Sequence, residues 1–501
     1  MQKRSDPEGT RLPIKLDSTS NGEFAPIPLT RRNAVANETA RERATRNARR
    51  SGLSRRNFLV SSCGAASTLL AFNEVNAAAG KTGGFFAIDA AAALDAEVAA
   101  AALEGREFIF DVQGHFVDPK GKWIREDPSR GEGFKFAEKT GCSLSERPER
   151  NSHLDCIGPE EFVKDIFLDS DTDMMVLSFV PSTRETEPLT IEEADATRQI
   201  VANLEGNRRL MLHGRVNPNQ AGDLDAMDEL KERWNVCGWK TYTQYGPGGK
   251  GFFLSDEDSG IPFIEKARSL GVNIICVHKG LPFGPRSYEH SQCHDIGVVA
   301  KRYPDVDFLI YHSGFVAGKP EQAYEGDGSG DGIDTLIKSL IDNDVPPNSN
   351  VYAELGSTWR FLMRDPDNAA HGLGKLFKYC GENNVLWGTD SIWYGSPQDQ
   401  IQAFRTFQIS EEFQERYGYP EITPELRARV FGLNATRPYK IDLEEVLLRA
   451  HNDEISSRRE NYLNDRDPSY LTYGPKTRRE FLNLRNWERE AGKKAWTPHK
   501  S

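Results

Sequence analysis

Four short polar motifs in this 501-residue chain lie at the ends of apolar runs that are typical of buried strands. They contain, in order along the chain, Gln113 with His115, then His278, then His312, and finally Asp390 within Trp-Gly-Thr-Asp. Imidazole nitrogen and carboxylate oxygen are the ligands that zinc and similar divalent ions prefer, and a catalytic site keeps one position open for water. The residue types therefore predict a metal site that contains His115, His278 and Asp390.

The elements that must position these residues follow a regular order. Segments of helical period, such as 191–204 and 262–270, lie between several apolar runs. This alternation favours parallel strands with crossover helices, and the carboxyl ends of such strands meet on one face. We therefore predict an α/β fold, a (β/α)8 TIM barrel of the metal-dependent hydrolase type. Its strands are 107–112, 174–180, 210–216, 236–242, 272–277, 308–311, 351–355 and 385–388.

Other polar residues follow the same strand ends. Gln113 and His115 are two positions apart, so alternation along a strand points both side chains into the barrel mouth. Basic groups beside the mouth suit an anionic ligand, which in an acidic protein favours a small carboxylate substrate. The candidate substrate-binding residues are Lys240, Glu354, Arg286 and Arg360.

These motifs resemble the amidohydrolase superfamily, in particular the branch that includes aminocarboxymuconate semialdehyde decarboxylase and related decarboxylases and lactonases. The resemblance runs from about residue 108 to 441 and includes the closing phrase from Asn434 to Tyr439. It implies that His115, His278 and Asp390 are metal ligands and that His312 is the catalytic histidine. In binuclear relatives a carboxylated lysine stands at the place of Lys240, but we expect Lys240 to act here as a charge.

Gln113 departs from the family pattern, because it stands where the first histidine of a His-x-His pair is expected. A neutral amide oxygen is a poorer zinc ligand than imidazole. Either Gln113 holds the ion weakly or supports it from outside, or the ion has been lost and the remaining groups act alone. We expect a divalent metal, with zinc favoured over manganese, and keep metal-free catalysis as the alternative.

The resemblance allows two reactions. In the expected hydrolysis, a metal-activated water loses its proton to Asp390 and attacks an ester, lactone or amide, while His312 stabilises the oxyanion or protonates the leaving group. In the alternative, an unsaturated or aromatic acid is decarboxylated. A third reading is a catalytically dead barrel that binds a ligand.

The first 60 residues carry 13 Lys and Arg against 6 Asp and Glu, a net charge of +7. Since the whole chain carries −12, the remaining residues carry −19. This acidic body argues against nucleic-acid binding. The basic part ends in Ser-Arg-Arg-Asn-Phe-Leu-Val at 54–60, followed by a weakly apolar run, and it resembles a twin-arginine export signal. We expect residues 1–80 to be a leader recognised by the twin-arginine export machinery. Because this leader is long, either the true start lies downstream of Met1 or the first 50 or so residues are a solvated extension. The protein would then be periplasmic or secreted, and cytoplasmic if the leader is not a signal.

Three further segments complete the expected organisation. Residues 81–105 contain an Ala-rich helix at 91–103 that packs on the barrel, 106–440 form the barrel, and 441–501 form a charged helical extension with an amphipathic helix at 477–489. Long loops at 116–159 and 313–350 should shape the active face. Two smaller expectations concern Cys142 with Cys156, which could form a disulfide, and the oligomeric state, for which relatives suggest a homodimer. The chain has no run of about 20 apolar residues for an integral membrane segment.

Overall fold

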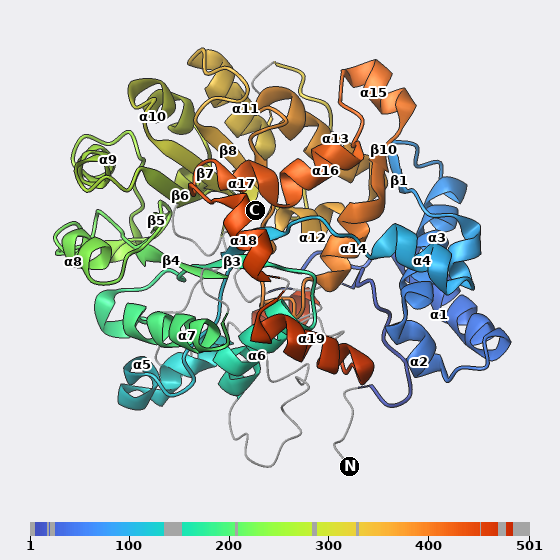
Figure 1. Ribbon diagram of the computed structural model, residues 1–501. Coiled ribbons are helices and arrows are strands. Elements are labelled where there is room, and N and C mark those ends of the chain that lie inside the picture. The colour runs from blue at the N-terminus through green and yellow to red at the C-terminus, as the bar shows by residue number, and fades with distance from the viewer. Residues whose placement is uncertain are drawn as a thin grey trace.

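The computed structural model describes residues 6–17, 20, 26–134, 153–205, 209–282, 288–326, 330–450, 452–468 and 477–483. Eight parallel strands stand next to one another in sequence order, with helices on the outside (Figure 1). All eight predicted strands are confirmed, and so is the predicted (β/α)8 barrel. The strands are β2 (Phe110–Gly114), β3 (Met174–Leu177), β4 (Leu210–Arg215), β5 (Gly238–Tyr242), β6 (Ile274–His278), β7 (Asp307–Tyr311), β8 (Val351–Glu354) and β9 (Val385–Leu386).

Backbone hydrogen bonds close the barrel between β2 and the segment that follows β9. The N–H of Asp390 donates to the carbonyl oxygen of Gln113 at 3.1 Å, and the N–H of His115 donates to that of Ser391 at 2.6 Å. A parallel bridge pairs Gly114 with Ser391. The two ends of a stretch of nearly 280 residues therefore run side by side, with three candidate site residues in register.

The helices cover the barrel because each has one apolar face. In α9 the residues Ile261, Phe263 and Ile264 are buried, and α11 buries Leu336 and Leu340. The predicted helix at 191–204 is α7, and the one at 262–270 is α9, which begins two residues earlier. The outer helices are α7 (Ile191–Asn203), α8 (Met227–Glu232), α9 (Gly260–Ser269), α10 (Ile296–Arg302), α11 (Ile333–Asp342), α12 (Thr358–Leu362), α13 (Pro366–Tyr379) and α14 (Gln398–Thr406).

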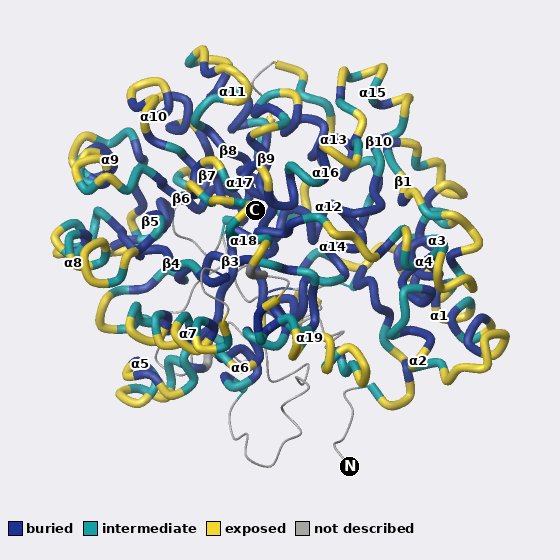
Figure 2. The backbone as a smooth tube through the Cα atoms, viewed as in Figure 1, coloured by how far each residue is buried: buried dark blue, intermediate teal, exposed yellow. Residues whose placement is uncertain are grey.

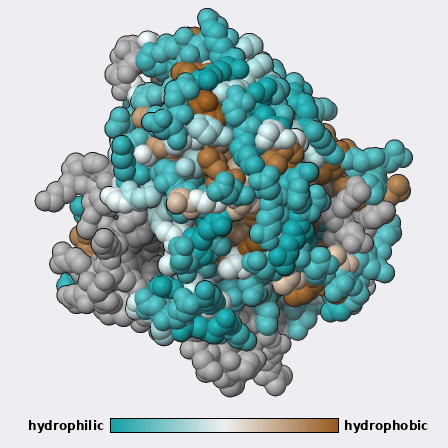
Figure 3. Space-filling model, turned by 90° about the vertical axis from the view of Figure 1, so that its left-hand side faces the viewer, coloured by the Kyte–Doolittle hydropathy of each residue, from teal (hydrophilic) through white to brown (hydrophobic). Residues whose placement is uncertain are grey.

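Burial follows this layering. The barrel strands are buried along their length, whereas the outer turns of α8 and α9 are exposed (Figure 2). The face turned toward the viewer in Figure 3, on the side of α8 and α9 in Figure 1, is mostly hydrophilic, with hydrophobic side chains in separate patches. No helix among the described residues is long and apolar enough to cross a membrane.

The described N-terminal part is folded against the barrel domain, which differs from the solvated extension that was one of two alternatives for the first 50 or so residues. Helices α1 (Arg31–Arg50), α2 (Arg55–Val60) and α3 (Ser62–Ala78) form a helical group at one side of the barrel (Figure 1). Small alanines of α1 face α3, and Ala40 and Ala44 are fully buried. Ser54 caps α2, and Arg56 forms an ion pair with Asp467 at 2.8 Å. Export and cleavage of this segment stay predictions.

The Ala-rich segment divides into two pieces. Residues 90–93 form a 3-10 turn, and α4 (Ala96–Leu103) begins after Asp95, whose carboxylate accepts hydrogen bonds from the N–H groups of Glu97 and Val98. The predicted start at residue 91 was therefore wrong, because Asp95 is the stronger N-cap. α4 packs against α3 and α14, as the prediction of a helix on the barrel implied.

A small sheet joins the N-terminal part to the outer layer. Strand β1 (Gly84–Phe86) pairs antiparallel with β10 (Phe407–Ile409) after α14. The remaining helices of this region are α15 (Glu411–Tyr417), α16 (Pro424–Ala428) and α17 (Asn434–Thr436). Two more short helices, α5 (Lys122–Glu126) and α6 (Pro159–Val163), lie in the long connection after β2. Cys156 in that connection is disulfide-bonded, while Cys142, its expected partner, lies outside the described residues.

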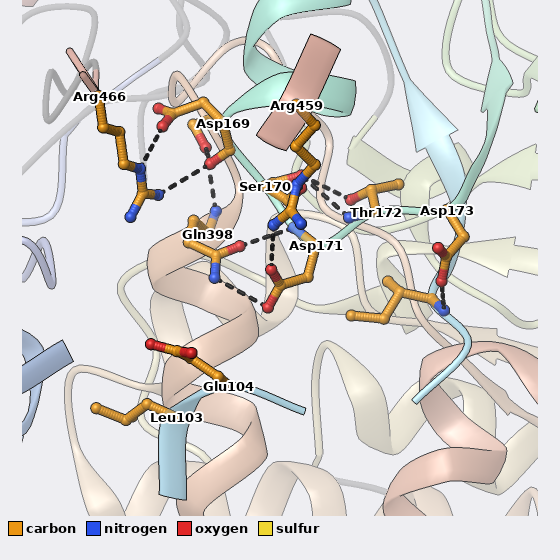
Figure 4. Close-up of polar contacts among 12 residues, drawn as sticks. Leu103, Glu104, Asp169, Ser170, Asp171, Thr172, Asp173, Gln398, Arg459 and Arg466 are labelled. Atoms are coloured by element: carbon orange, nitrogen blue, oxygen red, sulfur yellow. Dashed lines mark hydrogen bonds and ion pairs between the residues drawn. The ribbon is translucent and has the colours of Figure 1, made fainter. Parts of the chain in front are cut away.

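The C-terminal extension is helical and is held to the barrel by arginines. It contains α18 (Leu443–Ala450), α19 (Glu454–Asn464) and a helical piece at 478–483; the rest of the predicted helix at 477–489 lies outside the described residues. Arg459 bonds Asp171 at 2.6 Å and Arg466 bonds Asp169 at 2.9 Å, in the segment just before β3 (Figure 4). These contacts fix the extension on the outside of the barrel.

Candidate active site

The strand ends bring the predicted site residues to one face of the barrel. Gln113 lies in β2 and His115 follows it, His278 ends β6, and His312 follows β7. Asp390 comes four residues after β9, and its backbone bond to Gln113 places its side chain beside those of Gln113 and His115. The predicted common direction of Gln113 and His115 is confirmed, because their side-chain nitrogens lie 3.3 Å apart.

Gln113, His115 and Asp390 form a triangle of polar atoms. Nε2 of Gln113 lies 3.0 Å from Oδ1 of Asp390 and 3.3 Å from Nε2 of His115, and these last two atoms are 3.3 Å apart. His115 Nδ1 donates to the carbonyl oxygen of Ser178 at 3.1 Å, which leaves the Nε2 lone pair facing the triangle. The amide of Gln113 donates to both partners.

The spacing of this triangle fits a divalent ion. Two ligand atoms that each lie about 2.0–2.1 Å from one ion are themselves separated by about 3.0–3.4 Å. The amide nitrogen and oxygen of Gln113 exchange places by a half turn of the terminal group. Among the described residues no group of three or more His, Cys, Asp or Glu is placed to hold a metal ion. In the present triangle the third group is the amide of Gln113. The residues that would hold an ion are thus His115, Asp390 and Gln113 with its oxygen turned inward.

His278 and His312 form a second pair. Nε2 of His312 lies 3.2 Å from Nδ1 of His278, and Nδ1 of His312 donates to the carbonyl oxygen of Gly356 at 2.6 Å. This second bond assigns the proton of His312 to Nδ1, so His278 is the donor between the two rings. The structure therefore places His278 next to the predicted catalytic histidine, and its role as a metal ligand stays a prediction.

Burial sets the charge states of the site. His115, His278, His312 and Asp390 are each 3% exposed or less. Burial, followed by the nearby charge of Lys240, lowers the pKa of His312 to about 3, and burial lowers the pKa of His115 and His278 well below the usual value. Burial also raises the pKa of Asp390 to about 6, although Ser357 and Lys240 oppose this rise. The imidazoles are therefore neutral.

Lys240 and Glu354 lie inside the barrel beneath this face. Nζ of Lys240 is 3.7 Å from the ring centre of Tyr311 and 4.7 Å from that of Tyr242, in cation–π contact. Glu354 accepts the N–H of His312 at 3.0 Å and the N–H of Gly356 at 2.6 Å, and burial raises the pKa of its carboxyl to about 8. Glu354 therefore orients His312 through its backbone N–H.

The other two basic candidates are not joined to this group. Arg286 lies outside the described residues. Arg360 is buried in α12, where its guanidinium donates to the backbone carbonyl oxygen of Lys15 in the N-terminal segment. The helical register after β8 turns Arg360 toward that segment, so its predicted role in substrate binding finds no support in this contact.

Two contacts were missed in the sequence. The hydroxyl of Ser357 donates to Oδ2 of Asp390 and lies 2.7 Å from the hydroxyl oxygen of Tyr394. The indole of Trp393 is stacked on the imidazole of His115, with 5.6 Å between ring centres and 15° between planes. Ser357 stands in a Leu-Gly-Ser-Thr segment after the seventh predicted strand, so its position at a strand end was the available signal.

The backbone at the site adopts left-handed conformations that non-glycine residues rarely take. The φ angles are 67° at His312, 55° at Ser357 and 59° at Asp390. Such conformations cost about 1–3 kcal/mol each and persist where the surrounding structure fixes them. Three of them on contacting residues indicate that the geometry of the site is held by the fold.

Comparison with known proteins identifies one family. The sequence profile of a family described as Amidohydrolase matches residues 164–441, which is more than half of the chain. This agrees with the resemblance noted in the sequence, although the match begins after the first strand. A search of curated protein sequences finds no match.

Solved structures with a similar arrangement are distant. The chain resembles 5-carboxyvanillate decarboxylase from Sphingomonas paucimobilis (12% identity, TM-score 0.42, covering 67% of this chain and 100% of that one). It also resembles 2,6-dihydroxybenzoate decarboxylase from Rhizobium (14%, 0.37, 67% and 99%). A third is 5-carboxyvanillate decarboxylase from Novosphingobium aromaticivorans complexed with manganese (12%, 0.41, 68% and 97%).

Proposed function

Because the chain belongs to the amidohydrolase family, we propose that it is a carboxy-lyase that removes carbon dioxide from a small aromatic or unsaturated carboxylic acid. The observation that carries this proposal is the burial of His115, His278, His312 and Asp390 beneath aromatic side chains. A carboxylic acid bound in such a site is kept from water, and burial favours its protonated form, which carries the proton that the reaction transfers. The stacked ring of Trp393 suits a flat acid.

His312 is the residue that moves the proton. In the reaction the bond between the carboxyl carbon and the adjacent unsaturated carbon breaks, and its electron pair stays on that carbon. Since Nδ1 of His312 is bound to the carbonyl oxygen of Gly356, Nε2 accepts the proton of the acid and passes it to the carbon. The products are carbon dioxide and the neutral compound that carries hydrogen in place of the carboxyl group, and His312 returns to its neutral state.

The surrounding groups hold the substrate and His312. Lys240 supplies a buried positive charge near the site, and Glu354 fixes the backbone of His312 through its N–H. His115, Gln113 and Asp390 would hold a divalent ion, which when bound supplies positive charge for the carboxylate oxygens. Ser357 keeps the carboxylate of Asp390 in place.

Hydrolysis of a carboxylate-bearing ester, lactone or amide was the first expectation from the sequence. It uses the same residues but needs a water molecule beside the reacting carbonyl. The burial of all four residues favours the reaction that consumes no water. Hydrolysis is therefore one of the outcomes that the following experiment separates.

The experiment compares two substrate panels with the full-length protein. Aromatic and α,β-unsaturated acids labelled with ¹³C in the carboxyl group are incubated in D₂O, and matched esters, lactones and amides form the second panel. We expect labelled carbon dioxide and one deuterium on the carbon that carried the carboxyl group, with both lost in His312→Asn. Ester or lactone cleavage without labelled carbon dioxide would replace the lyase by a hydrolase. No turnover in either panel, with acids bound in calorimetry, would leave a ligand-binding barrel.

A further inference from the structure

The amide oxygen of Gln113 accepts no hydrogen bond from the residues that the structure describes. Within the described part of the chain, Oε1 of Gln113 is buried and has no hydrogen-bond partner, while its nitrogen serves both His115 and Asp390. A buried carbonyl oxygen without a donor is unfavourable, because it loses its hydrogen bonds to water and gains none from the protein. The present orientation of the amide therefore satisfies one end of the group and leaves the other unsatisfied.

The unsatisfied oxygen faces another oxygen. A Cβ atom placed on Gly356 would lie 2.1 Å from Oε1 of Gln113 and 2.6 Å from Oε1 of Glu354, so both oxygens border the same small space. Oε1 of Glu354 accepts the N–H of Gly356 at 2.6 Å, whereas Oε1 of Gln113 accepts no hydrogen bond from a described residue. A half turn of the amide would place its N–H groups in this space, where Glu354 can accept.

The same half turn changes the triangle. Oε1 of Gln113 would replace Nε2 beside the lone pair of His115 and Oδ1 of Asp390. Three acceptor atoms about 3 Å apart repel one another unless a cation lies between them. Oxygen inward is thus the orientation in which Gln113 can bind a cation together with His115 and Asp390.

We propose that Gln113 selects the ion of this site, binding it through Oε1 while its N–H turns to Glu354, and thereby shifts the preference from Zn²⁺ toward Mn²⁺. With Gln113 turned, the triangle offers two oxygens and one imidazole nitrogen. Oxygen ligands suit Mn²⁺, whereas added imidazoles favour Zn²⁺. This inference deepens the proposed function and rests on the same site, but ion binding can be measured without any substrate.

The test is a pair of titrations on the chelator-treated full-length protein. Bound Mn²⁺ is counted by electron paramagnetic resonance, and Zn²⁺ is then added to obtain the ratio of the two affinities. We expect one Mn²⁺ per chain in the natural protein. Gln113→His should raise the preference for Zn²⁺ over Mn²⁺ at least about tenfold, and Gln113→Glu should tighten Mn²⁺. Glu354→Ala should weaken Mn²⁺, because the turned amide loses the carboxyl oxygen that accepts its N–H.

The controls separate ion selection by Gln113 from the binding of ions to an imidazole added elsewhere on the protein. Gln408→His adds an imidazole on β10, outside the barrel, and should leave both affinities unchanged. Equal Zn²⁺-to-Mn²⁺ ratios in the natural protein and Gln113→His, or no bound Mn²⁺ in the natural protein, would overturn the inference. Decarboxylation by a protein that binds no ion would refute this inference and leave the proposed function intact. Selective ion binding without turnover of any acid would refute the proposed function and leave this inference intact.

Discussion

His312 and His278 face each other with 3.2 Å between Nε2 and Nδ1, and the far nitrogen of His312 is fixed by the carbonyl oxygen of Gly356. His278 therefore donates to the atom that, in the proposed reaction, has to accept the proton of the substrate. Entry of the acid must replace this contact. The pair thus explains how Nε2 is kept in position before the substrate arrives.

Replacement of His312 tests this role. We expect His312→Asn to lower kcat by about 10²–10⁴-fold, because an amide side chain transfers no proton, while the number of bound ions stays the same. Steady-state kinetics and metal analysis measure the two effects. His371→Asn, which changes a histidine of α13 in the same way, is the control and should keep its activity. Unchanged turnover in His312→Asn would show that another group carries the proton.

Ser357 is predicted to be a positioning residue for Asp390. Loss of its hydroxyl in Ser357→Ala removes a hydrogen bond to a carboxylate and should lower kcat about tenfold or more with a smaller change in KM. Because this donor lowers the pKa of Asp390, the acidic side of the pH–rate profile should move to higher pH. Ser313→Ala removes a hydroxyl bound to the Glu354 carbonyl oxygen and should leave that side in place. An unshifted profile in Ser357→Ala would refute the role.

His371 predicts how stability depends on pH. Burial, followed by the charge of Lys375, lowers its pKa to about 4 from the usual 6.5. Between these values the unfolded chain binds more protons at this residue, so His371 contributes stability that is present above pH 6.5 and lost as the pH falls toward 4. The urea midpoint should therefore drop between pH 7 and 4.5 by less in His371→Gln than in the natural protein. Equal drops in both proteins would contradict the assignment.

The folded N-terminal part makes a prediction about stability. Phe72 of α3 is 1% exposed, so Phe72→Ala should lower the free energy of unfolding by about 3–5 kcal/mol. Val35 of α1 is 49% exposed, and Val35→Ala serves as the control with little change. Urea unfolding of the full-length chain measures both. A negligible effect of Phe72→Ala would mean that α3 is not part of the folded protein.

The barrel could be predicted because its strands are buried on both faces and read as continuous apolar runs. The same property identified the strand ends, and with them His278, His312 and Asp390. Side-chain alternation was enough to pair Gln113 with His115, since that rule depends on the local backbone alone.

Other features depend on contacts between distant segments, which the sequence does not display. Arg360 follows a strand end as expected, but its partner is the carbonyl oxygen of Lys15, 345 positions earlier. Ser357 stands among small residues without a pattern of its own, and only the position of Asp390 gives its hydroxyl a role. A solvated N-terminal extension was one of the expectations. The structure differs because the alanines of α1, each only weakly apolar, pack closely against α3.

The amino group of Lys15 donates to the backbone carbonyl oxygens of Tyr394 and Ser396, in the loop that carries Trp393 over His115. Lys15 in the N-terminal segment thus holds the loop that forms one side of the site. Cleavage of the folded chain near Ala78 would remove Lys15 together with α1 to α3 and expose the side of α4 that packs against α3. Loss of residues 1–78 from the folded protein would therefore free the Tyr394–Ser396 loop from Lys15.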